Sequence, residues 1–272
     1  MFAAISGLKQ HQVMLDVTSN NIANVNTVGY KTSRTTFQDS LSQLQRGGSA
    51  PGPNNGGTNG VQVGLGVNLG SIDNMMGSGA FQSTGNALDV AVQGPGWFRV
   101  GPSTAPAVPT TFTYTRAGNF KTNTDGYLVT QDGMYVTGRT AAGGGTDTLI
   151  QIPSGATEVA IGQDGAVTYT PAGGPPRQVA GYMSLATFPN EAGLTRVSGN
   201  RWQASDSSGT EVVDTPGVTN HGLTVSGVIE MSNVDLATEF TTMISAQRGF
   251  QANSRVISAS DEMLQDVVNM KR

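Results

Sequence analysis

The sequence contains few residues of the types that carry out catalysis or bind metals. His11 and His221 are its only histidines, and it has no cysteine. A chain without cysteine forms neither disulfides nor thiolate metal sites. His11 falls on the polar side of an expected helix, and His221 lies in a loop rich in turn residues. We therefore expect neither a metal site nor a cofactor site.

The carboxylates and the aromatic residues offer no catalytic arrangement either. Asp125, Asp132 and Asp164 each precede a glycine, which is the pattern of a tight type I′ hairpin turn. Trp97 could stack against a sugar, but a tryptophan inside an expected strand is more often part of a core. The sequence has no phosphate-binding loop, no zinc-protease motif and no nucleophile grouped with a base. We predict that the protein is not an enzyme.

The amino-acid composition argues against two classes of binding partner, nucleic acids and membranes. Charged residues are 12% of the chain, about half of the usual ~25%, and 37 of the 272 residues are glycine, about twice the usual ~7%. The net charge of −4 gives no general attraction to nucleic acid or to an anionic membrane. No apolar run approaches the length of a membrane-spanning helix, and residues 1–9 lack the features of a cleaved signal peptide. We expect no nucleic-acid binding and no membrane insertion.

The longest expected element is a C-terminal helix over residues 232–272. The stretch from Asn233 to Arg272 has no proline and a single glycine, and Ser232 followed by Asp235 suits a helix start. Steps of four and three residues trace an apolar line similar to that of a coiled coil. The residues on this line that we expect at an interface are Leu236, Phe240, Met243, Phe250, Ile257, Leu264 and Val268. A second apolar line comprises Val256, Met263, Val267 and Met270.

A second helix is expected at residues 2–24, before the turn-rich segment 24–29. The same stepping gives an apolar line that contains Ile5, Leu8, Leu15 and Ile22. This line is shorter and less apolar than the C-terminal one, so it cannot cover all of it. We predict that the two helices pair and that neighbouring copies of the chain cover the remainder.

Between the helices, the sequence changes to strand periodicity. Residues 30–45 favour an extended segment or one short helix around residues 36–45. Residues 46–60 are mostly Gly, Asn, Pro and other small residues, which is typical of a flexible linker. From residue 61 onward, apolar residues alternate with polar ones or glycine, with short turns between the runs. We assign residues 61–231 to an antiparallel β region, and the predicted fold class is mainly β with terminal helices (α+β).

Several separated segments resemble signature motifs of the bacterial flagellar rod and hook proteins. They are TSNNIANVNTVGYK at residues 18–31, STGNALDVAVQGPGWF at 83–98, YTRAGNF at 114–120, SNVDL at 232–236 and AQRGFQANSRVI at 246–257. They occur in the order found in that family, and the resemblance covers nearly the whole chain apart from residues 46–60 and the loops. On these motifs the chain is identified as a member of the family.

The resemblance implies how the domains are organised. Residues 1–30 and 232–272 would form a helical inner domain that lines a hollow tube, with the two helices paired. Residues 31–60 would connect it, through the linker, to a β-rich outer domain of residues 61–231. Asn20, Asn21 and Asn24 are candidates for bonding backbone groups at the end of the first helix and across subunits.

Within the family, residues 64–74 and 246–250 look most like the short form of the hook protein. The resemblance then implies a homo-polymer, a flexible tube that couples the motor rod to the filament. Its neighbours would be rod, hook-cap and hook–filament junction proteins. The subunit would leave the cell through the flagellar type III export apparatus without cleavage of a signal peptide.

Two other interpretations remain open at this point. The distal rod protein of the basal body is the main competitor within the family, because its size is similar and the large inserted domain of long hook proteins is missing. A secreted β-domain that binds a ligand through Trp97 and tyrosines belongs to a different class. Polymerisation of the chain distinguishes the flagellar interpretations from the binding module.

Overall fold

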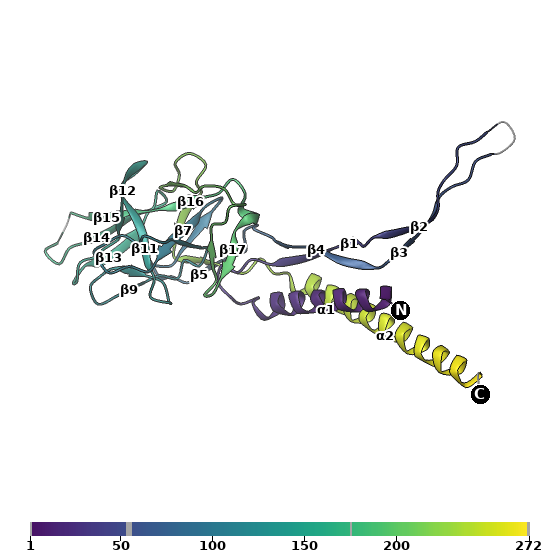
Figure 1. The fold of residues 1–272 in the computed structure, drawn as a ribbon. Coiled ribbons are helices and arrows are strands. Elements are labelled where there is room, and N and C mark those ends of the chain that lie inside the picture. The colour runs from purple at the N-terminus through teal and green to yellow at the C-terminus, as the bar shows by residue number, and fades with distance from the viewer. Residues whose placement is uncertain (1, 53–55, 175, 271–272) are drawn as a thin grey trace. The chain divides into compact units, whose positions relative to one another are not determined.

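The computed structural model of the chain describes residues 2–52, 56–174 and 176–270. These residues form two compact units (Figure 1). The helix–ribbon unit lies within Met1–Ala23, Ser33–Met75 and Asp235–Arg272, and the β unit lies within Asn24–Thr32 and Met76–Val234. The chain therefore passes from one unit to the other after residues 23, 32, 75 and 234.

The helix–ribbon unit contains the terminal helices and two pairs of strands. Helix α1 spans Phe2–Ala23, and helix α2 spans Leu236–Met270. The strand pairs are antiparallel: β1 (Ser33–Asp39) with β4 (Val67–Asn74), and β2 (Ser42–Arg46) with β3 (Val61–Gly64). We call these four strands the ribbon. The predicted helices at both ends of the chain are confirmed.

The ribbon differs from the sequence-based assignment of residues 31–75. Residues 36–45 lie largely in strands and not in a short helix, consistent with the β-branched and aromatic residues around Thr36 and Phe37. In the predicted linker of residues 46–60, Arg46 ends β2 and the residues after it connect β2 to β3 instead of separating two domains; residues 53–55 lie outside the described residues. Because β3 and β4 pair with β2 and β1, they belong to this unit and not to the β region expected from residue 61.

The β unit is built from short antiparallel strands. They are β5 (Phe81–Ser83), β6 (Val90–Gln93), β7 (Trp97–Gly101), β8 (Thr113–Thr115), β9 (Lys121–Thr122), β10 (Leu128–Val129), β11 (Tyr135–Ala141), β12 (Gly144–Leu149), β13 (Thr157–Ile161), β14 (Ala166–Thr170), β15 (Gln178–Met183), β16 (Leu185–Thr187), β17 (Thr195–Val197), β18 (Arg201–Gln203), β19 (Val212–Asp214), β20 (Leu223–Ser226) and β21 (Val228–Glu230). Among the described residues, the largest sheet holds 13 strands, with β13, β14, β15, β11, β7, β8, β18 and β17 as successive neighbours. The predicted fold class, mainly β with terminal helices, is confirmed.

Large apolar side chains fill the interior of the β unit. One cluster gathers around Phe98, Phe120 and Val136. A second gathers around Trp97 and Trp202, whose rings meet edge to face with centroids 5.8 Å apart. Trp97 has no exposed surface, so it cannot stack against a ligand, and its assignment to the core is confirmed.

The three Asp-Gly pairs form turns, but not of type I′. A type I′ turn needs positive φ at both central residues. Here Gly126 has φ +83°, Gly133 and Gly165 each have φ +77°, and the preceding aspartates are not among the residues with positive φ. Gly126 N–H donates to Asn123 O at 3.0 Å, the bond of a type I turn followed by a left-handed glycine. Asn123 Oδ1 accepts the N–H of Asp125 and so favours this geometry.

Asp235 caps the first turn of α2. Its Oδ1 accepts the N–H of Ala237 at 3.0 Å, and its Oδ2 accepts the hydroxyl of Thr238 at 2.9 Å. These bonds, with that from Thr238 the largest influence, hold the pKa of the Asp235 carboxyl below its usual range. Ser232, the predicted cap, lies ahead of the helix and accepts the backbone N–H of Val234 instead. The cap is thus the acidic residue and not the serine.

Replacing Asp235 with alanine is expected to lower amide protection in the first turn of α2, because Ala237 N–H loses its acceptor. Asp235→Asn keeps an accepting oxygen and should lower protection less, and Ser232→Ala serves as the control. In the wild type, the capping contribution is present above the unfolded-state pKa of the carboxyl and is lost as the pH falls through the lower folded-state pKa. Protection factors measured by NMR test this. Unchanged protection in Asp235→Ala would contradict the assignment.

Candidate subunit interface

The helix–ribbon unit buries almost no large side chain. Its buried residues, among those described, are Ala4, Thr18, Asn21 and Ala246, all small or polar. The β unit, by contrast, buries two tryptophans and a full set of large aliphatic residues. Because apolar burial is the dominant favourable term in folding, the helix–ribbon unit has little of its own to hold it together. Its structure indicates a part that is completed by contact with other molecules.

Most of the large apolar side chains that are exposed lie in this unit. Those in the described ranges are Phe2, Ile5, Phe37, Leu41, Leu44, Val61, Val63, Leu65, Ile72, Met75, Leu236, Phe240, Ile244, Val256, Met263, Leu264, Val267, Val268 and Met270. We call them the apolar surface. The corresponding residues of the β unit are Phe81, Val179, Val212 and Leu223. Large exposed apolar patches in soluble proteins mark interaction sites.

The predicted interface line of α2 is only partly covered. Met243, Phe250 and Ile257 are half-buried. The exposed members of the line are Leu236, Phe240, Leu264 and Val268. At about 1.5 Å per residue, the 22 residues of α1 extend about 33 Å and the 35 residues of α2 about 52 Å. Residues 261–270 are accordingly exposed on every side.

The interface line predicted for α1 lies beside the face that is buried. Leu8, Leu15 and Ile22 are half-buried and Ile5 is exposed. The buried positions Ala4, Thr18 and Asn21 precede Ile5, Ser19 and Ile22 by one residue each. One residue turns a helix by about 100°. The apolar line is therefore rotated toward the rim of the helix pair, where a neighbouring molecule can reach it.

Helices α1 and α2 run side by side in opposite directions (Figure 1). They approach closely because glycines face polar side chains. A Cβ on Gly249 would lie 2.5 Å from the His11 ring, and a Cβ on Gly7 would lie 2.8 Å from Nδ2 of Asn253. His11 is thus not on the polar outer side as expected, but is half-buried and packs edge to face on Phe37, with ring centroids 6.2 Å apart. Larger residues at the two glycines would push the helices apart.

Asn21 bonds the end of α1 to both the ribbon and α2. Its Nδ2 donates to Ser33 O at 2.8 Å and to Glu239 Oε1 at 3.2 Å, and its Oδ1 accepts the N–H of Ser33 at 3.1 Å. Partial burial raises the pKa of the Glu239 carboxyl, against the opposing effect of the Asn21 bond. Asn24 accepts the hydroxyl of Thr27, and Asn20 is exposed. Of the three predicted asparagines, Asn21 bonds a distant backbone group within the subunit.

The ribbon contributes apolar surface that the sequence analysis divided between the connecting segment of residues 31–60 and the outer domain of residues 61–231. Leu41, Leu44, Val63 and Leu65 are all exposed on β2, β3 and their flanking residues. The alternation of apolar and polar residues from residue 61 onward was the only feature of the sequence that indicated β3 and β4. It identified strands, but it does not say which strand is the partner.

In the described ranges, no helix combines the length and apolar character needed to cross a membrane.

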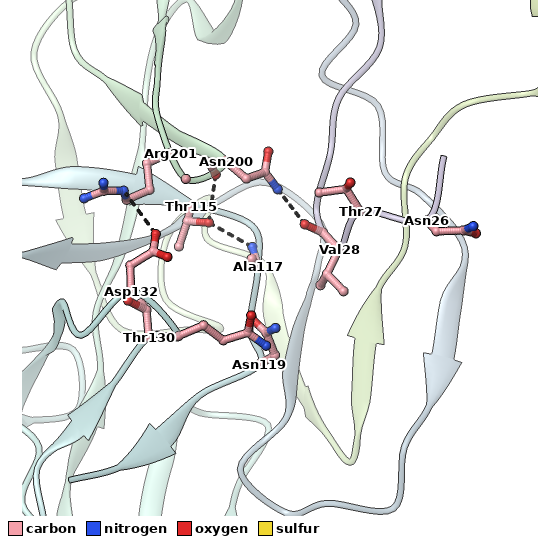
Figure 2. Close-up of a pocket in the computed structure, with 12 residues that line it drawn as sticks. Asn26, Thr27, Val28, Thr115, Ala117, Asn119, Thr130, Asp132, Asn200 and Arg201 are labelled. Atoms are coloured by element: carbon pink, nitrogen blue, oxygen red, sulfur yellow. Dashed lines mark hydrogen bonds and ion pairs between the residues drawn. The ribbon is translucent and has the colours of Figure 1, made fainter. Parts of the chain in front are cut away.

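A polar cavity in the β unit is the other candidate site (Figure 2). It has a volume of about 440 Å³ and is lined by threonines and amides together with Asp132 and Arg201. Its groups bond to one another: Thr115 Oγ1 donates to Asn200 O at 3.2 Å, and Asn200 Nδ2 donates to Val28 O at 2.5 Å. Arg201 Nε lies 3.9 Å from Asp132 Oδ2. These bonds hold segments of the β unit together and bring no nucleophile to a base.

Comparisons with known proteins agree with the motifs. Three family models match: "Flagella basal body rod protein" over residues 1–31, "Flagellar hook protein FlgE/F/G D1 domain" over 91–169, and "Flagellar basal body rod FlgEFG protein C-terminal" over 225–270. The flagellar basal-body rod protein FlgG of Bacillus subtilis is 48% identical over 273 residues, covering 100% of this chain and 98% of the relative. FlgG of Caulobacter vibrioides is 40% identical, covering 96% and 95%.

A hook protein is also similar, at lower identity. The flagellar hook protein FlgE of Borreliella burgdorferi is 26% identical over an alignment of 443 residues, which covers 100% of this chain and 99% of the relative. The matches to the rod proteins span both terminal helices, the ribbon and the β unit. An apolar surface on the terminal helices agrees with a protein that works as part of a larger structure. The chain belongs to the family of bacterial flagellar rod and hook proteins, and it is an axial structural protein of the flagellum.

Proposed function

We propose that this chain is the subunit of the distal rod of the flagellar basal body. The observation that carries the proposal is the whole-length similarity to rod proteins, 48% over 273 residues with the relative from Bacillus subtilis. The hook function predicted from the sequence has weaker support, because the hook relative is 26% identical. The distal rod, the alternative in the sequence analysis, is therefore the better supported function.

The lengths of the alignments also favour the distal rod over the hook. The alignment with the hook relative extends over 443 residues, far more than the 272 residues of this chain, whereas those with the rod relatives extend over 273 and 264 residues. The hook relative thus contains long stretches with no counterpart here. The rod relatives match residue for residue with few insertions.

The apolar surface supports assembly from many copies of the chain. Each large apolar side chain that becomes fully buried contributes roughly 1.5–3 kcal/mol. The C-terminal part of α2 presents several such side chains, with Val268 at 67% and Met270 at 80% exposure. We infer a homo-polymer in which neighbouring copies cover this surface. Its other partners would be the adjoining axial proteins and the flagellar export apparatus, and it would reside in the basal body after export.

Adding charge to the apolar line of α2 is expected to prevent polymer formation. Leu264→Asp and Val268→Asp each place a carboxylate where a neighbour would have to bury it, and removal of residues 260–272 deletes the surface. Asn269→Asp adds the same charge on the side of Glu262 and is the matched control. Light scattering and electron microscopy of the purified chain measure assembly. Thermal unfolding should show that the β unit is unchanged, and normal polymers from Val268→Asp would contradict the interface.

The organelle of a strain lacking this chain distinguishes rod from hook. A distal rod subunit is needed before a hook can be built, so we expect basal bodies with a truncated rod and no hook. Expression of the wild-type chain should restore both. Basal bodies that keep a full-length rod and lack only the hook would instead support the hook function.

A further inference from the structure

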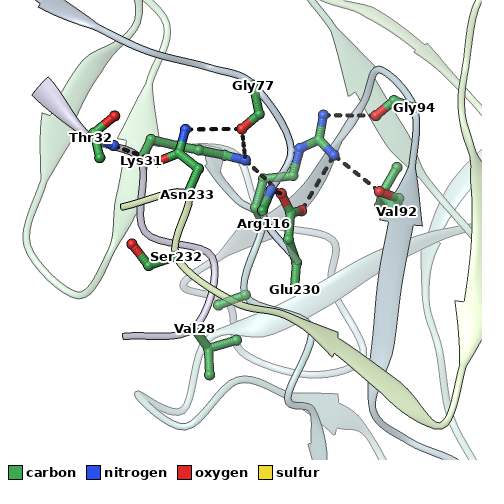
Figure 3. A network of polar contacts seen from close by, with 12 residues as sticks. Val28, Lys31, Thr32, Gly77, Val92, Gly94, Arg116, Glu230, Ser232 and Asn233 are labelled. Carbon is green, nitrogen blue, oxygen red and sulfur yellow. Dashed lines mark hydrogen bonds and ion pairs between the residues drawn. The ribbon is translucent and has the colours of Figure 1, made fainter. Parts of the chain in front are cut away.

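A buried cluster of three charged side chains lies inside the β unit (Figure 3). Lys31 and Glu230 have fully buried side chains, and Arg116 is almost fully buried. Lys31 Nζ lies 2.6 Å from Glu230 Oε1, and Arg116 Nη1 lies 3.6 Å from Glu230 Oε2. A single carboxylate thus holds two cations away from water.

Backbone groups add further bonds to the cluster. Lys31 Nζ also donates to Gly77 O at 2.9 Å, and Gly79 N–H donates to Glu230 Oε1 at 2.9 Å. Arg116 donates to the carbonyl oxygens of Val92 and Gly94, at 3.3 and 2.9 Å. Burial lowers the pKa of both the Lys31 ammonium and the Arg116 guanidinium, and the carboxylate of Glu230 opposes this effect.

Lys31, Glu230 and the glycines that they bond lie next to three of the four places where the chain crosses between the β unit and the helix–ribbon unit. The chain crosses between the two units after residues 23, 32, 75 and 234, and the last three of these passages are the ones that the cluster adjoins. Lys31 adjoins the first of these three, Gly77 and Gly79 adjoin the second, and Glu230 adjoins the third. The cluster therefore links these three passages within a single set of contacts.

Further bonds tie the same segments together. Gly29 N–H donates to Glu230 O at 2.7 Å, and Thr32 N–H donates to Asn233 Oδ1 at 2.8 Å. Asn233 Nδ2 donates to Gly77 O at 3.1 Å. Each of these bonds joins the segment beside one passage to the segment beside another.

We propose that Lys31, Arg116 and Glu230 form a mechanical junction that makes these three passages move as one body. Glu230 is its centre, because it bonds both the first and the second passage while adjoining the third. Force that reaches the β unit along any of the three connections is then shared among all of them and passes into the core strands through Arg116. This force-sharing role rests on the proposed rod function, but the joint movement of the passages does not.

A purely stabilising role is the alternative. Removing one partner from a buried ion pair is strongly destabilising, whereas replacing all partners with apolar residues of similar volume is often neutral. The apolar replacement restores packing, but it cannot accept the Gly79 N–H or donate to Gly77 O. The two roles therefore predict different behaviour for the same variant.

Amide hydrogen exchange of the full chain tests the proposal. In Glu230→Gln, the amides of Gly29, Thr32 and Gly79 should exchange about tenfold faster or more, and together, because the junction is weakened at its centre. The amides of β7 should not change. Asp214→Asn, which removes the partner of Arg139 Nη1 at 3.6 Å elsewhere in the unit, is the matched control and should leave all three amides protected.

The triple variant Lys31→Met, Arg116→Met and Glu230→Met decides between the roles, even if Glu230→Gln loosens the whole unit. We expect its thermal unfolding temperature to return toward that of the wild type while the three amides still exchange faster. Return of their protection along with stability would overturn the junction. So would a change confined to Gly79 in Glu230→Gln. None of these measurements requires assembled rods, so failure of the rod function would leave the outcome readable.

Discussion

The close contact of α1 with α2 determines which surface the chain offers to others. Gly249 accommodates His11 and Gly7 accommodates Asn253, so the helices meet through small and polar residues. Helix pairing therefore buries no large apolar side chain fully, and those of the C-terminal part of α2 remain exposed. A chain folded in this way is incomplete by itself. We propose that its remaining apolar burial comes from neighbouring molecules.

The β unit, by contrast, buries large apolar side chains within itself. Trp97, Trp202 and the aliphatic clusters are buried within it, and short antiparallel strands bond their backbones to one another. Such a unit buries its own apolar core and suits a rigid part of a repeating structure. The buried bonds of Glu230 lie close to the points where segments of the β unit connect to the helix–ribbon unit. The protein thus combines a part that buries its own core with one that, as we propose, is completed by assembly.

Much of the architecture follows from sequence periodicity, and the corrections have local physical causes. The period of the apolar residues predicted both helices and the β-rich middle, but it could not show that β3 and β4 pair with β2 and β1, because strand alternation carries no information about the partner. The sequence could not decide between Ser232 and Asp235 as the helix cap, because both residue types suit that position, and the structure shows that Asp235 is the cap. The buried face of α1 could not be predicted from the apolar line, because it contains Ala4, Thr18 and Asn21, which are small or polar. Family motifs identified an axial protein, and whole-length similarity was needed to favour rod over hook.

Amide hydrogen exchange across the whole chain, compared between the free subunit and the assembled polymer, tests the central claim most directly. We expect weak protection in the ribbon and in residues 257–270 of the free subunit, and strong protection of the same amides in the polymer. The core strands of the β unit should be protected equally in both. If α2 and the ribbon were already as protected in the free subunit as the β unit, the claim that the helix–ribbon unit is completed by assembly would be wrong.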